Sequence, residues 1–358
     1  MNIFVDCHVF DGNLQGTTSY LKGLYNELIK DKTKTFYLAS LNSKNLEKVF
    51  GTHTNIIYLT YSNKNKIYRL LYDIPKLIYN NKIDYAHFQY VVPPIKLCKY
   101  IVTIHDVLFI DYPKYFPFNY KISNNILFRI SAIYADFVLT VSNYSKERIE
   151  HHFKINNVIV TPNAVDEEYF KDYDKNELKE SAKSKFCIEN YFLFVSRLEP
   201  RKNHLTLLKV FVENEFYKNY MLVFVGYKAI EDKSYNTFYN QLPATVKNKI
   251  ITFSNINFDD LLIFVRAATL SIYPSIAEGF GIPPLESIAA NVPTICSNST
   301  AMSDFCFMEK YLFDPLDEQD LLLKINKCLK NQNHYLFDKL KNKYNWQFSA
   351  SKINEILA

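Results

Sequence analysis

The sequence predicts an α/β protein with two domains, each containing a parallel β-sheet. Short apolar runs alternate with segments of helical periodicity almost to the end of the chain, which is typical of parallel α/β architecture. The chain of 358 residues is longer than one hydrophobic core usually supports, and its 48% of apolar residues are enough for two cores. Only 7 glycines and 13 prolines argue against a fibrous or linker-rich protein.

The first domain is expected to contain seven strands. They are predicted at residues 3–6, 36–39, 55–59, 85–88, 100–104, 137–140 and 158–161. One helix is predicted over residues 18–30 and another over residues 66–79. The apolar side of the second helix would consist of Ile67, Leu70, Leu71, Ile74, Leu77 and Ile78. Its opposite side would carry Lys66, Arg69 and Lys76.

The second domain is expected to follow a polar, charged stretch from residue 166 to about residue 185, which we interpret as a linker. Its strands are predicted at residues 191–195, 222–225, 250–253, 270–273 and 293–296. Its helices are predicted at residues 205–211, 259–267 and 284–290. The last stretch, residues 317–358, is expected to be helical and contains the single tryptophan. The predicted domains therefore span residues 1–170 and 185–343.

The net charge limits the class of protein. A formal charge of +5 is too small to indicate a nucleic-acid-binding protein. The positive surplus lies mainly in the first 170 residues, and it suits an anionic substrate, an anionic membrane face or simply solubility. One basic face is formed by Lys64, Lys66, Arg69 and Lys76. This face would rest on a membrane that bears a lipid-linked acceptor, or it would be a solvated helix face.

The cysteines and the apolar runs indicate the compartment. Six cysteines without paired or His-Cys spacing are expected to be reduced thiols. No basic-then-apolar signal precedes the first strand, and no apolar run approaches the roughly 18–20 residues of a membrane helix. We therefore expect a cytoplasmic protein that is at most peripheral to a membrane.

Two common nucleotide-binding motifs are absent from the sequence. Neither half has a G-x-G-x-x-G after its first strand, and no Walker-type lysine loop occurs. This argues against a dinucleotide-dependent dehydrogenase and a phosphate-loop NTPase. It does not argue against nucleotide binding by other loops.

The strongest chemical signal is the segment PSIAEGFGIPPLE at residues 274–286, which follows a predicted strand and opens a helix at a pair of prolines. The backbone around Gly279 and Gly281 can approach a ligand closely, and amides at a helix N-terminus attract anions. A carboxylate at Glu286 can accept hydrogen bonds from a ribose diol, and one at Glu278 can hold sugar hydroxyls. The alternative is a strand–turn–helix junction with two solvated glutamates.

A second constellation, SRLEPRKN at residues 196–203, follows the first strand of the second domain. Arg197 offers a planar fork and Lys202 a point charge, and both suit a diphosphate. Cations at this position would stabilise the negative charge that accumulates when a nucleoside diphosphate departs, without a metal ion. Alone, the segment is equally compatible with a basic strand end on a solvent loop.

Together these two segments resemble the retaining GT-B glycosyltransferases of family 4. Further similarities are DGNLQGTT at residues 11–18, IHD at 104–106, VSNYS at 141–145, TPNAVD at 161–166 and the final helix around Trp346. The resemblance implies two Rossmann-like domains that face each other across a cleft. The donor would bind to the C-terminal domain and the acceptor to the N-terminal one. A C-terminal helix at residues 344–358 would cross back to the N-terminal domain.

The resemblance also implies roles for individual residues. The residues expected at the donor are Gly16, Ser196, Arg197, Lys202, Ile256, Gly279, Phe280, Gly281 and Glu286. Those expected to act at the reacting centre are His105, Arg197, Lys202 and Glu278. Those expected on the acceptor side are Gly12, His87 and Asp106. By itself, His105 would also fit a strand-end histidine whose ring is satisfied by its neighbours.

Two positions depart from the family pattern. Thr17 stands where a second small residue usually accompanies the loop glycine, and this bears on the acceptor side of the loop. Ala164 stands where a glycine usually follows Asn163, and this bears on the hinge between the domains. Neither position is an expected donor ligand.

The expected reaction is the transfer of a hexose from a nucleotide-sugar to a glycan or lipid-linked acceptor in surface polysaccharide or glycoconjugate assembly. GDP-mannose is the expected donor because it is frequent in the family. No metal ion or other cofactor is expected, because no DxD-like motif lies at a plausible phosphate site. The alternatives are a catalytically silent sugar-nucleotide-binding partner in a glycan-assembly complex and a GT-B sugar-nucleotide epimerase. A glycogen-type phosphorylase would need a cofactor lysine and a much longer chain.

Overall fold

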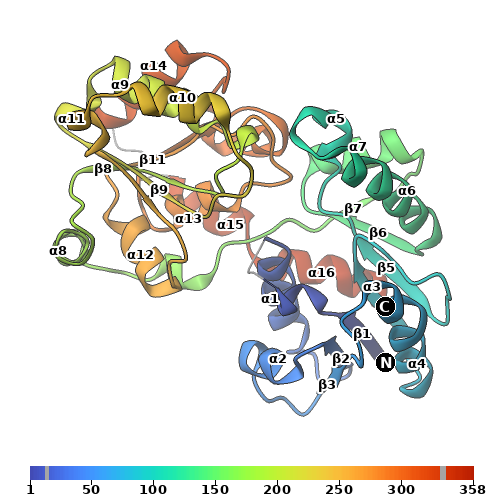
Figure 1. Cartoon of the computed structure of the whole chain (residues 1–358). Helices are drawn as coiled ribbons and strands as arrows, with labels where there is room; N and C mark the ends of the chain where they lie inside the picture. Colours follow the sequence, from blue (N-terminus) through green and yellow to red (C-terminus); the bar gives the residue numbers. More distant parts are fainter. Residues whose placement is uncertain (13–15, 331–335) are drawn as a thin grey trace. The chain divides into compact units, whose positions relative to one another are not determined.

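The computed structural model describes residues 1–12, 16–330 and 336–358. The chain divides into two compact units, Met1–Ala164 with Tyr344–Ala358, and Val165–Lys343. Each unit contains one parallel sheet with helices packed against it (Figure 1). The expected α/β class with two Rossmann-like domains is therefore confirmed. The first unit ends at Ala164, before the expected bound at residue 170.

The sheet of the first unit has parallel strands in the order β3-β2-β1-β4-β5-β6-β7. They are β1 (Asn2–Asp6), β2 (Thr35–Ser40), β3 (Ile56–Thr60), β4 (Tyr85–Gln89), β5 (Lys99–Thr103), β6 (Phe137–Thr140) and β7 (Ile159–Val160). All seven strands were predicted, because each is a short apolar run. The order reverses between β1 and β4, and ligands usually bind at the carboxyl ends of strands beside such a reversal.

Helices cover both faces of this sheet (Figure 1). The longer ones are α1 (Gly16–Leu28), α2 (Ser43–Phe50), α4 (Ile74–Asn80), α6 (Phe118–Tyr134), α7 (Asn143–Phe153) and α16 (Trp346–Leu357). The short ones are η1 (His8–Asp11), α3 (Lys66–Tyr68), η2 (Arg69–Asp73), α5 (Leu108–Asp111) and η3 (Pro113–Tyr115). The core lies between these helices and the central strands, where Phe4, Phe88 and Val102 are fully buried.

The segment over residues 66–79 is not the single amphipathic helix that the periodicity predicts. A π-helical turn, η2, separates α3 from α4 and shifts the side chains around the axis. Ile67 is therefore 67% exposed, although it was expected in the core. Arg69 turns inward instead, where its guanidinium lies 3.8 Å from the Asp6 carboxylate and above the Tyr61 ring. The expected basic face thus loses Arg69 and keeps only lysines.

The C-terminal helix α16 packs on α1 within the first unit. This agrees with the prediction that the C-terminal helix crosses back to the N-terminal domain. The Trp346 ring lies so close to Gly23 of α1 that an added Cβ would stand 2.0 Å from its Cε2 atom. Ser349 Oγ donates a hydrogen bond to the Pro162 carbonyl at 2.6 Å. The absence of a side chain at Gly23 is therefore what lets the two helices approach.

The sheet of the second unit has the order β10-β9-β8-β11-β12-β13, again parallel. Its strands are β8 (Tyr191–Val195), β9 (Met221–Val225), β10 (Ile250–Phe253), β11 (Leu270–Tyr273), β12 (Thr294–Ser297) and β13 (Leu312–Phe313). The first five were predicted. The edge strand β13 was not, because a pair of apolar residues carries no periodicity. The order reverses between β8 and β11.

The second unit is also rich in helices. They include η4 (Glu167–Phe170), α8 (Lys175–Phe186), η5 (Pro200–Lys202), α9 (His204–Glu213), η6 (Phe216–Lys218), α10 (Lys233–Gln241), α11 (Ala244–Lys247), α12 (Phe258–Ala267), α13 (Ile282–Ala289), η7 (Thr300–Asp304), η8 (Cys306–Tyr311), α14 (Glu318–Lys330) and α15 (Leu336–Lys343). The expected helical C-terminal stretch also includes residues 331–335, which lie outside the described residues. Among the described residues of both units, no helix has the length and apolarity to span a bilayer.

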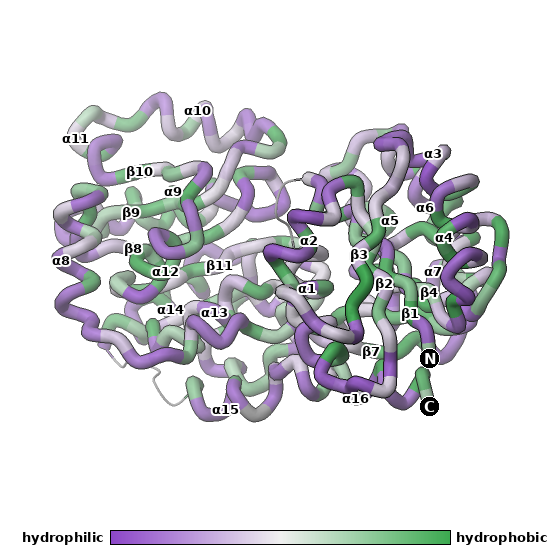
Figure 2. The backbone as a smooth tube through the Cα atoms, turned by 90° about the horizontal axis from the view of Figure 1, so that it is seen from below, coloured by the Kyte–Doolittle hydropathy of each residue, from purple (hydrophilic) through white to green (hydrophobic). Residues whose placement is uncertain are grey.

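The interpretation of residues 166–185 as a linker is wrong. Most of this stretch forms α8, which belongs to the second unit and packs on α12. Asp174 caps α8 by accepting hydrogen bonds from two backbone N–H groups. Phe186 contacts Phe264, with ring centroids 4.5 Å apart. Because α8 is mostly hydrophilic (Figure 2) and buries few apolar side chains, its sequence has the composition of a linker.

Candidate active site

The residues singled out in the second unit meet at the carboxyl edge of its sheet. Two neighbouring strands, β8 and β11, end there, and their loops are residues 196–203 and 274–281. The backbone joins the loops directly, because the Ile276 N–H donates to the Arg201 carbonyl at 2.8 Å. Two motifs far apart in the sequence thus form one site.

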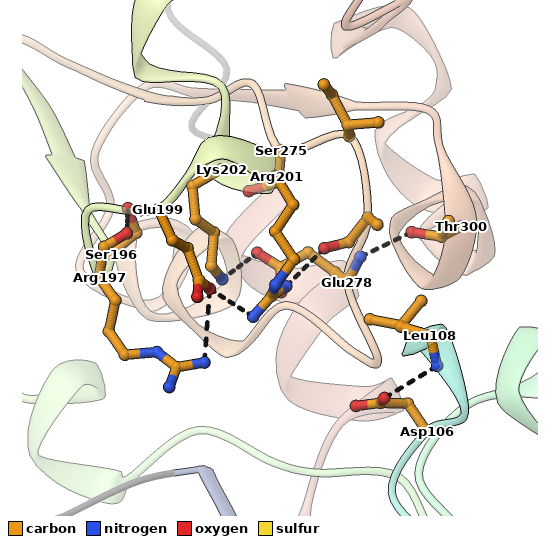
Figure 3. Close-up of polar contacts among 12 residues, drawn as sticks. Asp106, Leu108, Ser196, Arg197, Glu199, Arg201, Lys202, Ser275, Glu278 and Thr300 are labelled. Carbon is orange, nitrogen blue, oxygen red and sulfur yellow. Dashed lines mark hydrogen bonds and ion pairs between the residues drawn. The ribbon is translucent and has the colours of Figure 1, made fainter. Parts of the chain in front are cut away.

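Glu278 is the centre of an ion-pair cluster in this site (Figure 3). Its Oε1 atom lies 2.5 Å from Lys202 Nζ, and its Oε2 atom lies 3.3 Å from the NH1 atom of Arg201. The Glu278 N–H donates to Thr300 Oγ1 at 2.8 Å, which fixes the backbone of the loop. All three charged side chains are at most 14% exposed. The cluster is therefore rigidly held and largely shielded from solvent.

The cluster shifts the pKa values of its members. Burial raises the pKa of the Glu278 carboxyl, but Lys202 and Arg201 outweigh burial and hold the pKa at about 2. Burial lowers the pKa of the Lys202 ammonium, and Glu278 opposes this shift. Glu278 is therefore ionised at neutral pH and cannot donate a proton there.

Glu199 extends the cluster to Arg197. Its Oε1 atom lies 2.6 Å from Arg201 NH2 and 3.4 Å from Arg197 NH2. Arg197 is the most open cation of the group, with 40% of its side chain exposed. Sequence reasoning singled out Arg197 and Lys202 but missed Glu199 and Arg201. The alternation of charge within SRLEPRKN is the signal that would have found them.

The turn between the two motif glutamates depends on Gly281. This residue has a φ of +98° and is the N-cap of α13, and an added Cβ would lie 2.9 Å from Met302 Cγ. Phe280 is 7% exposed, and its ring packs edge-on against Phe305. Its ring is therefore part of the core, which leaves only its backbone to contact a donor. Gly279 is half-buried beside it.

Gly226 is a further site residue that sequence reasoning missed. It follows β9 with a φ of +154°, and an added Cβ would lie 1.9 Å from the Ser196 carbonyl oxygen. The Ser196 N–H donates to the Val225 carbonyl at 2.9 Å, and Ser196 Oγ lies 3.3 Å from His204 Nε2. A glycine at the end of a strand, in a chain with only 7 glycines, was the available signal.

Glu286 lies in the second turn of α13 and is half-buried. Burial, assisted by the nearby charge of Asp166, raises the pKa of its carboxyl to about 8. Within the described residues, no side chain forms a hydrogen bond or ion pair with this carboxyl. Ile256, which was expected near the base, is half-buried just after β10.

His105 follows β5 in the first unit and is 6% exposed. Its Nε2 atom donates to Gln89 Oε1 at 2.7 Å, and Tyr20 packs edge-on against its ring. Burial, assisted by neighbouring His87, lowers the pKa of His105 to about 3. The ring is therefore neutral, and its Nδ1 atom has no hydrogen bond to any of the described residues. Gln89 is a partner of His105 that sequence reasoning missed.

His87 is fully buried, so the expectation that it lines the acceptor side is not met. Its Nδ1 atom lies 2.8 Å from Tyr25 Oη and its Nε2 atom 2.8 Å from Thr103 Oγ1. Both ring nitrogens are thus satisfied. His87 lies in the middle of a central strand, where neighbouring side chains bury it. Its burial could not be predicted from the sequence alone.

The remaining residues expected in the first unit lie at the carboxyl edge of its sheet. Gly12 and Gly16 are exposed in the connection from β1 to α1, and α1 begins at Gly16. The residues between them, 13–15, fall outside the described part of the chain. Asp106 is half-buried after β5, and its Oδ1 atom accepts a hydrogen bond from the Leu108 N–H at 3.1 Å. Asp106 therefore binds the first backbone N–H group of α5, from the position before its N-cap Val107.

Two family models together match most of the chain. The model described as Glycosyltransferase Family 4 matches residues 14–169, and the model described as Glycosyl transferases group 1 matches residues 176–345. The chain belongs to the family 4 glycosyltransferases. Its parallel sheets, with their order reversals at β1/β4 and β8/β11, are the two halves of the GT-B fold of this family.

Similar proteins are known for this family 4 glycosyltransferase. O-antigen chain mannosyltransferase B of Escherichia coli is 27% identical over 258 residues, which are 70% of this chain and 67% of that protein. O-antigen chain mannosyltransferase RfbU of Salmonella typhimurium is 28% identical over 224 residues, which are 61% of this chain and 57% of that protein. A crystal structure of Anabaena HepE in complex with UDP and glucose has a TM-score of 0.73 and 16% identity, covering 100% of this chain and 99% of HepE. The last similarity shows a shared fold.

Proposed function

We propose that this glycosyltransferase transfers a hexose from a nucleotide-sugar to a glycan or lipid-linked acceptor, with retention of anomeric configuration, in the assembly of a surface polysaccharide or glycoconjugate. The observation that carries the proposal is the cluster of Lys202, Arg201 and Glu278 beside the turn at Gly281. The two curated relatives named O-antigen mannosyltransferases support mannose as the sugar, and GDP-mannose is the donor that we propose for it.

Arg197 and Lys202 bind the diphosphate of the donor in this proposal. Arg197 is open, and among the described residues its guanidinium forms one long ion pair, so most of its N–H donors remain available. The ammonium of Lys202 carries three N–H groups, and its bond to Glu278 uses one of them. Glu278 holds the ammonium in place, and Glu286 accepts hydrogen bonds from the ribose hydroxyls. The sugar lies against the backbone of Gly279 and Gly281.

The reaction proceeds by front-face attack in this proposal, because neither motif glutamate is placed as a nucleophile. The bond between the anomeric carbon and the leaving phosphate oxygen breaks, and a bond from the acceptor oxygen to the same carbon forms on the same face. The acceptor hydroxyl gives its proton to the departing phosphate oxygen. Arg197 and Lys202 stabilise the charge that develops on the diphosphate. His105 contacts the sugar through its neutral ring.

We further propose that the reaction needs no metal ion, since two cations of the chain neutralise the diphosphate. The expected result is full activity after treatment with EDTA. Loss of activity in EDTA that returns with Mg²⁺ or Mn²⁺ would contradict this. A lipid-linked acceptor would place the enzyme at the cytoplasmic face of a membrane.

The donor is tested by thermal unfolding of the purified protein with GDP, UDP, ADP and CDP. A ligand at 100 times its dissociation constant stabilises a protein by about 2.7 kcal/mol, which is a measurable rise in Tm. We expect the largest rise in Tm with GDP. In a second assay, we expect the protein to transfer radiolabelled mannose from GDP-mannose to a lipid extract. A rise in Tm with UDP alone would show that the donor is a UDP-sugar and not GDP-mannose. No rise with any nucleotide would contradict the proposed site.

Two alternatives predict different products. An epimerase would release free nucleotide from the donor without an acceptor, whereas a transferase requires one. A catalytically silent partner would bind the nucleotide but transfer nothing. Measuring nucleotide release with and without acceptor separates the three cases.

A further inference from the structure

Helix α6 of the first unit carries a long apolar stripe on its surface. Phe118, Ile122, Ile126 and Ile130 repeat every four residues, so they lie one above another on one side of the helix. Ile133 continues the same side, and the five side chains are between 49% and 69% exposed. Isolated exposed isoleucines are ordinary, but a contiguous stripe along a whole helix marks an interaction surface.

The opposite side of α6 already holds the helix to its own unit. Phe128 and Ala132 are buried there, and Phe128 stacks on Tyr90 with ring centroids 4.9 Å apart. Ser131 donates a hydrogen bond to the Leu127 carbonyl and accepts one from the Val92 N–H. The exposed stripe is therefore not the side that anchors α6 to the unit.

The loop before β5 extends the apolar surface beyond the end of α6. Ile95 and Leu97 are about half exposed, and Lys96 between them donates to the Tyr134 carbonyl at 2.9 Å. Tyr134 Oη donates in turn to the Pro94 carbonyl at 3.2 Å. These bonds fix the loop beside the C-terminal end of the helix, so its two apolar side chains lie next to the stripe.

The charged residues of α6 itself are all positive. The sequence of α6 contains Lys121 and Arg129 but no aspartate or glutamate. The carboxylate nearest the end of the helix in the sequence, Asp136, lies 2.9 Å from Lys96 Nζ. An apolar stripe flanked by cations suits the surface of a membrane that contains anionic lipids. The apolar side chains enter the acyl region, and the cations meet the negative headgroups.

We propose that α6 and the Ile95–Leu97 loop dock this protein on an anionic membrane surface, through partial insertion of the isoleucine stripe. This deepens the proposed function, since a lipid-linked acceptor lies at such a surface. The surface differs from the lysine face at residues 64–76 that the sequence indicates, where Arg69 is turned inward to Asp6. The stripe places five apolar side chains along one side of a regular α-helix, whereas the lysine face, which also exposes Ile67 and Tyr72, is interrupted by the π-helical turn η2.

The test is co-sedimentation of the full chain with vesicles of phosphatidylglycerol and phosphatidylcholine, compared with vesicles of phosphatidylcholine only. We expect binding to the anionic vesicles that weakens with added salt. The triple variant I122S/I126S/I130S should reduce the bound-to-free ratio at least about tenfold, because apolar side chains no longer enter the membrane. The charge variant K121E/R129E should reduce it on anionic vesicles in particular.

A control is L316S/L323S, which removes two leucines of the second unit that are more exposed than the three isoleucines. This control variant should bind vesicles as the unaltered chain does. All variants should have the Tm of the unaltered chain, because the changed residues are exposed. Equal binding by the triple variant, or no vesicle binding by the unaltered chain, would overturn the proposal. If the unaltered chain forms dimers but binds no vesicles, and the triple variant is a monomer, the stripe is instead a contact between two copies of the chain. Vesicle binding without transfer from any donor would contradict the proposed function and leave this surface standing.

Discussion

Lys202 Nζ lies 2.5 Å from Glu278 Oε1, although the two residues stand 76 positions apart in the sequence. Arg201 completes the pairing on the other carboxylate oxygen. The cation proposed to grip the leaving diphosphate is therefore held in place before any ligand arrives. Such preorganisation lowers the barrier, because the charge does not have to be gathered during the reaction.

Replacing Arg197 or Lys202 by alanine should lower kcat as well as raise KM. Each change removes a charge that acts most strongly when the diphosphate departs, and a loss of about 10²–10³-fold in kcat is expected. The measurement is steady-state transfer from the donor identified by thermal shift. Lys183, which is exposed on α8 and forms an ion pair with Glu189, provides the control K183A. A raised KM at unchanged kcat would exclude transition-state stabilisation.

Replacing Glu278 by glutamine should destabilise the protein at neutral pH. Lys202 and Arg201 would lose a buried counter-charge, which typically costs about 3–5 kcal/mol. The pKa of Glu278 is lowered from 4.5 to about 2, so its stabilising effect is complete above pH 4.5 and is lost as the pH falls through 2. Urea unfolding at several pH values should therefore show a difference between E278Q and the unaltered chain that shrinks with acidity.

The exposed pair of Lys183 and Glu189 offers the matched control for that experiment. Both side chains are about 60% exposed, so E189Q should change the free energy of unfolding by less than about 1 kcal/mol. If E278Q and E189Q behave alike, the cluster at Glu278 does not stabilise the second unit.

Nucleotide binding should strengthen as the pH rises toward 8. The pKa of Glu286 is raised to about 8 in the free protein, so its carboxyl is mostly protonated at pH 7. Accepting hydrogen bonds from two ribose hydroxyls favours the ionised form, and binding should therefore release a proton. Calorimetry in buffers with different ionisation enthalpies measures this release. E286Q should release none, and an unaltered chain without proton release would contradict the ribose role.

The same shift predicts a change of stability with pH. The folded protein binds a proton at Glu286 between pH 4.5 and 8 that the unfolded chain does not, so this group makes stability fall as the pH rises through that window. E286Q removes the titrating group and should flatten the unfolding free energy there. If the free energy of unfolding of both proteins changes with pH in the same way, the burial of the Glu286 carboxyl is too small to raise its pKa.

Replacing Gly23 by alanine should destabilise the first unit, although the change normally favours a helix by about 1 kcal/mol. The added Cβ would lie 2.0 Å from Trp346 Cε2, so α16 would have to move off α1. We expect a lower Tm and a cost of about 1–3 kcal/mol. In a W346A background the same change should become neutral or stabilising, and a double-mutant cycle measures this coupling. Additive effects would contradict the close packing.

Much of the fold could be predicted because it follows from local patterns. All seven strands of the first sheet and five of the second are short apolar runs, which need no knowledge of distant residues. Two errors arose where packing overrides pattern. The π-helical turn at Arg69–Asp73 rotates Ile67 outward and Arg69 inward. The polar helix α8 is stabilised by its contacts with α12, which its own sequence does not show.

The sequence by itself determined the family, the two sheets and the two motifs that carry the charges, because strand periodicity and loop chemistry are written in neighbouring residues. Only the tertiary structure decided which charges pair. It joins Lys202 and Arg201 to Glu278, inserts Glu199 between two arginines and buries His87 against Tyr25. The physical reason is that ion pairing and burial depend on distances between atoms of different strands, and parallel connections bring together residues that lie far apart along the chain.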